Sequence, residues 1–104
     1  MPSPTYYAHM HRDLGNGRFI VLHGLYYEDR KDIDHEAFIH VGEGSEGYGG
    51  VSLSKIEHTI NVRASQLETS SLTALGVDAV IATDIVREAR TWFTIEDTRK
   101  NHPL

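Results

Sequence analysis

The sequence predicts a single α+β domain, a class in which an antiparallel sheet packs against helices. Strand-like runs fill the first part of the chain, an Asn-Gly pair separates the first two of them, and the last third takes up a helical period. At 104 residues the chain has the common size of one domain. We therefore expect one domain over residues 1–104, with an N-terminal hairpin, one or two further strands, and C-terminal helices packed on one face of the small antiparallel sheet.

Two strands joined by a tight turn are predicted at the N-terminus. Residues 5–11 alternate between polar and apolar side chains, and residues 18–27 form a β-branched and aromatic run. Such runs are typical of strands, the second of a buried one. Between them, Asn16 and Gly17 both tolerate the positive φ of a type I′ turn, which is the strongest short hairpin signal.

The turn sets which side chains of the hairpin share a face. A two-residue loop at Asn16-Gly17 pairs Gly15 with Arg18 and, counting outward, Met10 with His23. On this register the more apolar face carries Tyr6, Ala8, Met10, Phe19, Val21 and Leu25. The other face carries Tyr7, His9, His11, Ile20, Leu22 and Tyr26.

The middle of the chain predicts further strands separated by loops. Residues 28–36 are charged and predict a loop, and residues 37–41 predict a third strand. Residues 42–50 hold five glycines in nine positions, which predicts a flexible or tightly turned loop. Residues 51–64 combine strand-like alternation with capping-box spacing. We favour a strand, because the β-branched residues Thr59, Ile60 and Val62 fall there.

The last third predicts helices. Ser65 and Glu68 have capping-box spacing, which predicts the start of a helix there. Gly76 is expected to be the C-cap of this helix. From Asp78 onward a core-facing stripe of an amphipathic helix is formed by Ile81, Ile85, Ala89 and Trp92. Residues 94–104 are polar and predict a loose tail.

Composition excludes several classes of function. The chain has no cysteine, so disulfides, thiolate zinc sites and cysteine nucleophiles are ruled out. Fifteen acidic against ten scattered basic residues give a net charge of −5, which argues against nucleic acid as a partner. The N-terminus lacks the profile of a signal peptide, and no apolar run reaches the roughly 20 residues of a membrane span. A cytoplasmic protein without a membrane partner is expected.

The sharpest local motif is His9-Met10-His11. On a strand these two imidazoles stand on one face, roughly 6–7 Å apart at the backbone, which suits a divalent metal such as zinc. A third ligand is required, and the Asn-Gly register places His23 on the opposite face. A longer loop would shift the pairing and place His23 on the same face as His9 and His11. Alternatively, His40, His58 or the Asp34-His35-Glu36 cluster could supply the third ligand. The competing interpretation is that both residues simply face solvent.

Other motifs carry less chemistry. The run from Gly42 to Gly47 reads G-x-G-x-x-G, but a strand rather than a helix is predicted to follow, and Glu43 and Glu46 would repel phosphates. No G-x-S-x-G elbow is present, and no serine has a recognisable base partner. The sequence therefore favours a binding protein over an enzyme.

The function predicted from the sequence is that of a small acidic module that occupies or inhibits a larger, basic protein, as immunity proteins, antitoxins or phage anti-defence inhibitors do. No cofactor is expected in this case. The residues predicted to contact the partner are Tyr7, Tyr26, Asp29, Asp32, Asp34, Glu36, Glu43 and Glu46. One alternative is a metal-dependent protein or enzyme built on His9 and His11. A homodimer that pairs an edge strand or buries the tyrosine face is a further alternative.

The histidine content predicts sensitivity to pH. Seven histidines are present, and protonating all of them would take the net charge from −5 to +2. If several are buried in the neutral form, stability should fall as the pH drops through about 6.

Overall fold

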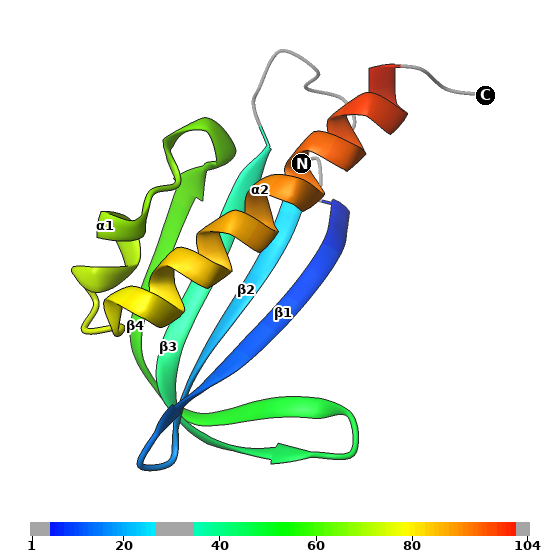
Figure 1. Cartoon of the computed structure of the whole chain (residues 1–104). Helices are drawn as coiled ribbons and strands as arrows, with labels where there is room; N and C mark the ends of the chain where they lie inside the picture. Colours follow the sequence, from blue (N-terminus) through cyan, green and yellow to red (C-terminus); the bar gives the residue numbers. More distant parts are fainter. Residues whose placement is uncertain (1–4, 27–34, 102–104) are drawn as a thin grey trace.

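The computed structural model describes residues 5–26 and 35–101. Four antiparallel strands form one sheet in the order β1-β2-β3-β4, and two helices follow them (Figure 1). This arrangement confirms the predicted α+β class. The elements are β1 (Thr5–Gly15), β2 (Arg18–Tyr26), β3 (Glu36–Gly47), β4 (Gly50–Arg63), the 3-10 turn η1 (Ala64–Gln66), α1 (Thr69–Thr73) and α2 (Ala79–Asn101).

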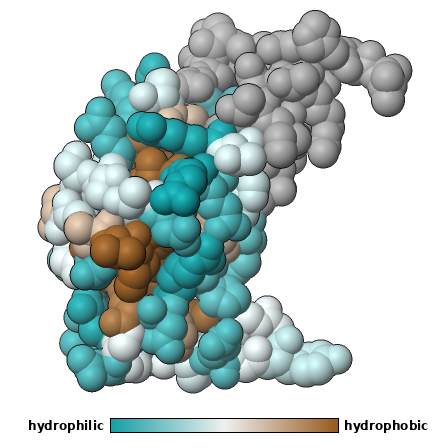
Figure 2. All heavy atoms as spheres, in the orientation of Figure 1, coloured by the Kyte–Doolittle hydropathy of each residue, from teal (hydrophilic) through white to brown (hydrophobic). Residues whose placement is uncertain are grey.

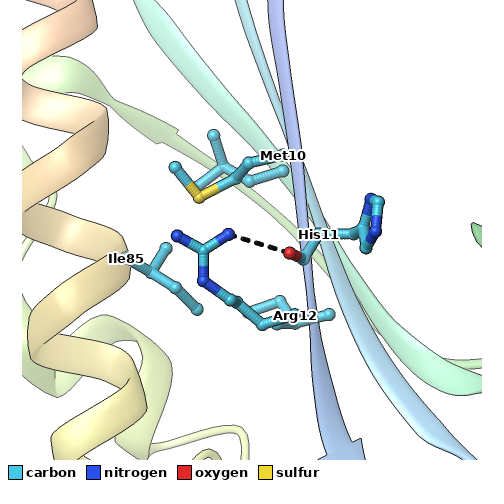
Figure 3. A pocket seen from close by; sticks show the side chains of 6 residues that line it. Met10, His11, Arg12 and Ile85 are labelled. Carbon is cyan, nitrogen blue, oxygen red and sulfur yellow. Dashed lines mark hydrogen bonds between the residues drawn. The ribbon is translucent and has the colours of Figure 1, made fainter. Parts of the chain in front are cut away.

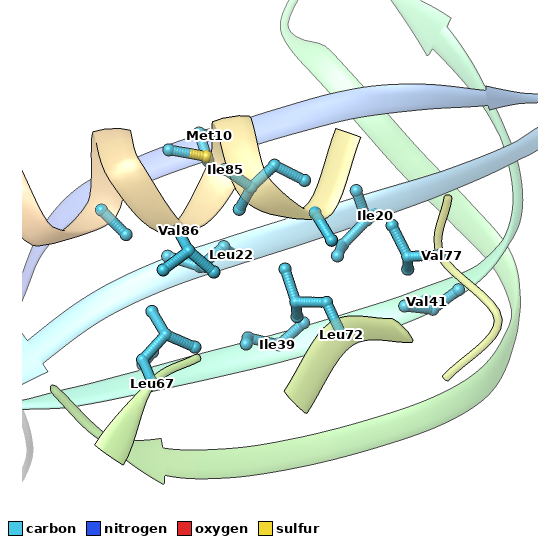
Figure 4. Packing of buried hydrophobic residues seen from close by; sticks show 13 residues of the cluster. Met10, Ile20, Leu22, Ile39, Val41, Leu67, Leu72, Val77, Ile85 and Val86 are labelled. Atoms are coloured by element: carbon cyan, nitrogen blue, oxygen red, sulfur yellow. The ribbon is translucent and has the colours of Figure 1, made fainter. Parts of the chain in front are cut away.

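One face of the sheet packs against the helices and forms the core. Ile20 and Leu22 of β2 and Ile39 of β3 are almost completely buried, and they belong to one cluster with Leu72 of α1 and Ile85 of α2 (Figure 4). The predicted helical stripe is confirmed, because its members Ile85 and Ala89 are buried in this cluster while Ile81 and Trp92 pack against it. Seen from the helix side, the surface is mostly hydrophilic, with separate hydrophobic patches (Figure 2).

The first hairpin has the predicted turn but not the predicted register. Asn16 and Gly17 have φ values of 56° and 74°, and Gly15 lies opposite Arg18. The register then shifts by one residue between Asp13 and Gly15, so Leu14 is an extra residue in β1. The Asp13 carboxylate accepts a hydrogen bond of 2.7 Å from the Gly15 backbone N–H, and Gly15 has φ 87°. A glycine with positive φ is what such a bulge requires.

This bulge exchanges the two faces of β1 from Asp13 back to Ala8, where a second register shift, between Tyr6 and Ala8, follows. Met10 lies opposite Leu22 and joins the core, whereas His9 lies opposite His23. The predicted pairing of Met10 with His23 is therefore wrong, and so is the prediction that Met10 shares a face with Phe19 and Val21. A one-residue slip moves every side chain of a strand to the other face.

The predicted glycine-rich loop at residues 42–50 is mostly strand. β3 continues to Gly47, β4 begins at Gly50, and both extend beyond the end of β2 as a two-stranded projection that bends away from the sheet (Figure 1). We call residues 42–56 the arm; at its base, Gly42 and Glu43 still pair with Phe19 and Arg18 of β2. The strand favoured for residues 51–64 is confirmed over nearly all of that range.

Two glycines allow the arm to bend at its base. The register of β3 and β4 shifts between Val41 and Gly42 and again between Glu43 and Gly44. A Cβ atom would lie 2.0 Å from the Lys55 carbonyl oxygen at Gly42 and 2.2 Å from the Ser52 oxygen at Gly44. Glycine is needed at both positions because the facing backbone comes this close.

α1 begins later than predicted and ends earlier, with Ala74 rather than Gly76 as its C-cap, whereas α2 begins at the predicted Asp78 and ends later. The capping box is formed by Glu68 and Ser71, so Glu68 is the N-cap of α1 and Ser65 lies in η1. Asp78 accepts hydrogen bonds from the N–H groups of Val80 and Ile81 and so starts α2. α2 continues to Asn101, so the predicted loose tail is wrong for residues 94–101, and residues 102–104 lie outside the described part.

Candidate functional site

The face of the sheet opposite the helices carries a row of histidines. His9 and His11 come from β1, His23 from β2 and His40 from β3, and no described helix lies on this side (Figure 1). We call it the histidine face. Its apolar members Phe19, Val21 and Leu25 are buried.

The closest pair in this row is formed across two strands. The Nδ1 atoms of His9 and His23 are 3.3 Å apart, and their ring centres are 4.8 Å apart. The ring centre of His11 is 6.0 Å from that of His9, and the ring centre of His40 is 6.4 Å from that of His23. The bulge at Leu14 is the cause, because it sets His23 directly opposite His9.

Polar neighbours hold the two ends of the row. His11 Nε2 lies 3.3 Å from a carboxylate oxygen of Glu46 on the arm, and His40 Nδ1 lies 2.9 Å from the Thr59 hydroxyl of β4. The ring of Phe38 meets His40 edge-on at 4.5 Å. The row is thus anchored to β4 at one end and to the arm at the other.

The pKa of His23 is lowered below its ordinary value. Burial is the largest cause, since it disfavours the charged imidazolium, and repulsion from the charged forms of His9 and His40 adds to it. His23 therefore tends to be neutral at neutral pH, and its Nδ1 lies within hydrogen-bond distance of His9 Nδ1.

The predicted metal pair shares a face, but no full metal site is formed around it. His9 and His11 point to the same side of β1, as the His-x-His spacing requires. In the described residues no three histidine or acidic side chains are grouped so that they could hold a metal ion. The expectation that His23 lies on the opposite face is wrong, for the reason given above. A metal site on this face stays a prediction.

The predicted partner contacts are scattered. Glu36 lies at the start of β3, where Asn61 donates a hydrogen bond of 3.3 Å to its carboxylate. Glu43 and Glu46 lie on the arm, roughly 23 Å or more from Glu36 along the strand at 3.3 Å per residue. Among the described residues, the predicted acidic contacts therefore lie in two separate places: Glu36 at the start of β3, and Glu43 and Glu46 on the arm. Asp29, Asp32 and Asp34 fall outside the described residues, as do the side chains of Tyr7 and Tyr26.

Sequence reasoning missed one residue of this region. Tyr48, at the tip of the arm, has an exposed fraction of 111%, the highest among the exposed large hydrophobic residues of the described part. Its signal in the sequence is that it is the single aromatic residue within a run of five glycines.

A shallow depression lies next to β1 on the helix side. It lies between β1 and α2, and its empty volume is about 120 Å³ when open solvent is included (Figure 3). Arg12 donates a hydrogen bond of 2.9 Å to the His11 carbonyl oxygen and pairs with Asp84 and Glu88 of α2. The ring of His11 points to the other side of the strand (Figure 3). Because the depression has no room for even a water molecule, we assign this feature to the packing of β1 on α2.

No family model, curated protein or solved structure matches this chain. Among the described residues, no helix combines the length and the apolar character needed to cross a bilayer.

Proposed function

We propose that the protein is a small acidic binding module that docks its arm on a basic surface of a larger protein. The observation that carries this proposal is the fully exposed Tyr48 at the tip of a bent, two-stranded projection.

The base of the arm is fixed, and this positions the backbone that carries Tyr48. Gly42 and Gly44 let the two strands of the arm approach closely at its base. The Gly44 N–H donates a hydrogen bond of 3.0 Å to the Gly17 carbonyl oxygen in the β1–β2 turn, and Glu46 reaches His11. A contact residue that is already positioned loses less entropy when it binds.

Tyrosine is well suited to this role. It supplies a large apolar ring and a hydroxyl at low conformational cost, and it is enriched among the residues that dominate interface energetics. Exposing the ring to water is unfavourable for the isolated protein, so burial against a partner would be a net gain.

The charges near the arm favour a basic partner. Glu43 and Glu46 are exposed on the arm, and Asp13 is exposed near the end of β1; Lys55 is the one base within the arm. Glu57, just beyond it, already pairs with Arg18 at 2.8 Å. Together with the net charge of −5, this balance would speed association with a cationic surface.

The proposal is tested by placing a photoreactive phenylalanine analogue at position 48 in the cells that express the chain. Illumination should give a covalent adduct with one larger protein, which mass spectrometry identifies. The same analogue at Val80, which is 78% exposed at the start of α2, is the matched control and should give none.

Two results would contradict the proposal. One is an adduct at position 48 with the mass of two copies of this chain, which would indicate self-association. The other is the absence of any adduct at position 48 that is not also formed at position 80.

A further inference from the structure

We infer that His9 and His23 form a two-histidine site for a divalent late transition metal ion such as Zn²⁺. The site differs from the His-x-His pair indicated by the sequence, because its second ligand comes from the neighbouring strand. It is independent of the arm and of the proposed docking function.

The separation of the two nitrogens fits the bite of one metal ion. With Zn–N bonds of about 2.0–2.1 Å and a tetrahedral angle, two ligating nitrogens lie about 3.3 Å apart. The Nδ1 atoms of His9 and His23 are 3.3 Å apart. Two imidazoles bound to one ion place their ring centres about 5 Å apart, and the observed separation is 4.8 Å.

The backbone holds the pair in place. His9 and His23 are directly opposite each other in the β1–β2 ladder, where Cβ atoms lie about 4.5–5.5 Å apart. The Leu14 bulge that creates this register is fixed by Asp13 and Gly15. A ligand pair mounted on two strands is better ordered than one mounted on loops.

The flanking histidines have other partners. His11 is held by Glu46 and His40 by Thr59, so neither is directed at the His9–His23 pair. The protein supplies two ligands to the ion, and water fills the remaining positions. Imidazole nitrogens suit Zn²⁺, Cu²⁺ and Ni²⁺ rather than Mg²⁺ or Ca²⁺.

The test is a calorimetric titration of the full, tag-free chain with Zn²⁺ alone. We expect one equivalent to bind, and His9→Asn and His23→Asn should each weaken binding by about tenfold or more. The matched controls are His11→Asn, on the same face, and His58→Asn, which lies opposite the core residue Val41; both should bind within about twofold of the parent chain.

A second measurement reads the ligating atom directly. In long-range ¹H–¹⁵N spectra of histidine-labelled protein, Zn²⁺ should shift Nδ1 of His9 and His23 and leave Nε2 protonated in both. This readout uses the parent chain, so it does not depend on whether a variant folds. The inference is overturned if His9→Asn and His23→Asn bind as the parent does, if His11→Asn loses as much affinity as His9→Asn, or if the shifts fall on other histidines.

Discussion

Single residues decide the shape of the arm. At Gly42 and Gly44 the opposite strand comes so close that a side chain would collide with a backbone carbonyl oxygen. The glycines of the run 42–50 thus have different roles, since the space around Gly47 and Gly49 is open. The sequence shows five glycines but not which of them are sterically required.

Replacing Gly42 by alanine should lower the free energy of unfolding by about 2 kcal/mol or more, because the new Cβ forces the backbone of β4 to move. Gly47→Ala is the control within the same arm and should change it by no more than about 0.5 kcal/mol. Urea unfolding followed by circular dichroism measures both. Equal effects at the two positions would contradict the account of the bend.

The partly buried imidazole of His23 should make stability depend on pH. Its pKa in the folded chain lies below the 6.5 of the unfolded chain, so the unfolded state binds more protons once the pH falls toward and below that value. The free energy of unfolding should therefore decrease from pH 7.5 to 5.5 and level off below the folded pKa. We expect His23→Asn to show a smaller decrease when both proteins are unfolded in chelator. Identical slopes for the parent and His23→Asn would show that His23 is not responsible.

At the scale of elements, one extra residue in β1 reorganises the whole histidine face. The Asn-Gly turn was predictable from its dipeptide, and the helical stripe of α2 from its period. The Leu14 bulge was not predictable, because it depends on a hydrogen bond that the Asp13 carboxylate accepts from the Gly15 N–H. Hydrophobic periodicity gives no sign of such a bond. The error then passed to every pairing counted outward from the turn, including that of His23.

Sequence patterns also failed to predict the arm and part of the candidate site. The arm was predicted as a loop because glycine is depleted in strands, yet here glycines permit a bent pair of strands. The candidate site was predicted in part: its His-x-His motif is visible in the sequence, whereas the cross-strand pair and the exposed Tyr48 depend on register and on the turn at the arm's tip.

Asp13→Ala should weaken the bulge and lower the free energy of unfolding by about 1 kcal/mol, the net contribution of one hydrogen bond. Asp13→Asn keeps an oxygen that can accept the bond from the Gly15 N–H, so it should remain close to the parent. Thermal melts of the three proteins at pH 7.5 provide the comparison. If the asparagine variant is as unstable as the alanine variant, the hydrogen bond is not what stabilises the bulge.

At the scale of the whole molecule, the two sides of the sheet have separate roles. The helix side buries the core, and Arg12 ties β1 to α2 there. The other side carries the histidine row, and the arm extends from the end of the sheet at which the β1–β2 turn lies (Figure 1). A stable core on one side leaves the arm and the histidine face available for binding.

The most direct test of the docking account is the affinity of Tyr48→Ala for the protein captured through position 48. We expect the Kd to rise by about tenfold or more, as for a residue that dominates an interface, while the circular dichroism spectrum and melting temperature stay unchanged because Tyr48 packs on nothing. Val80→Ala should bind as the parent does. A Kd for Tyr48→Ala equal to that of the parent would contradict the claim that the arm is the docking element.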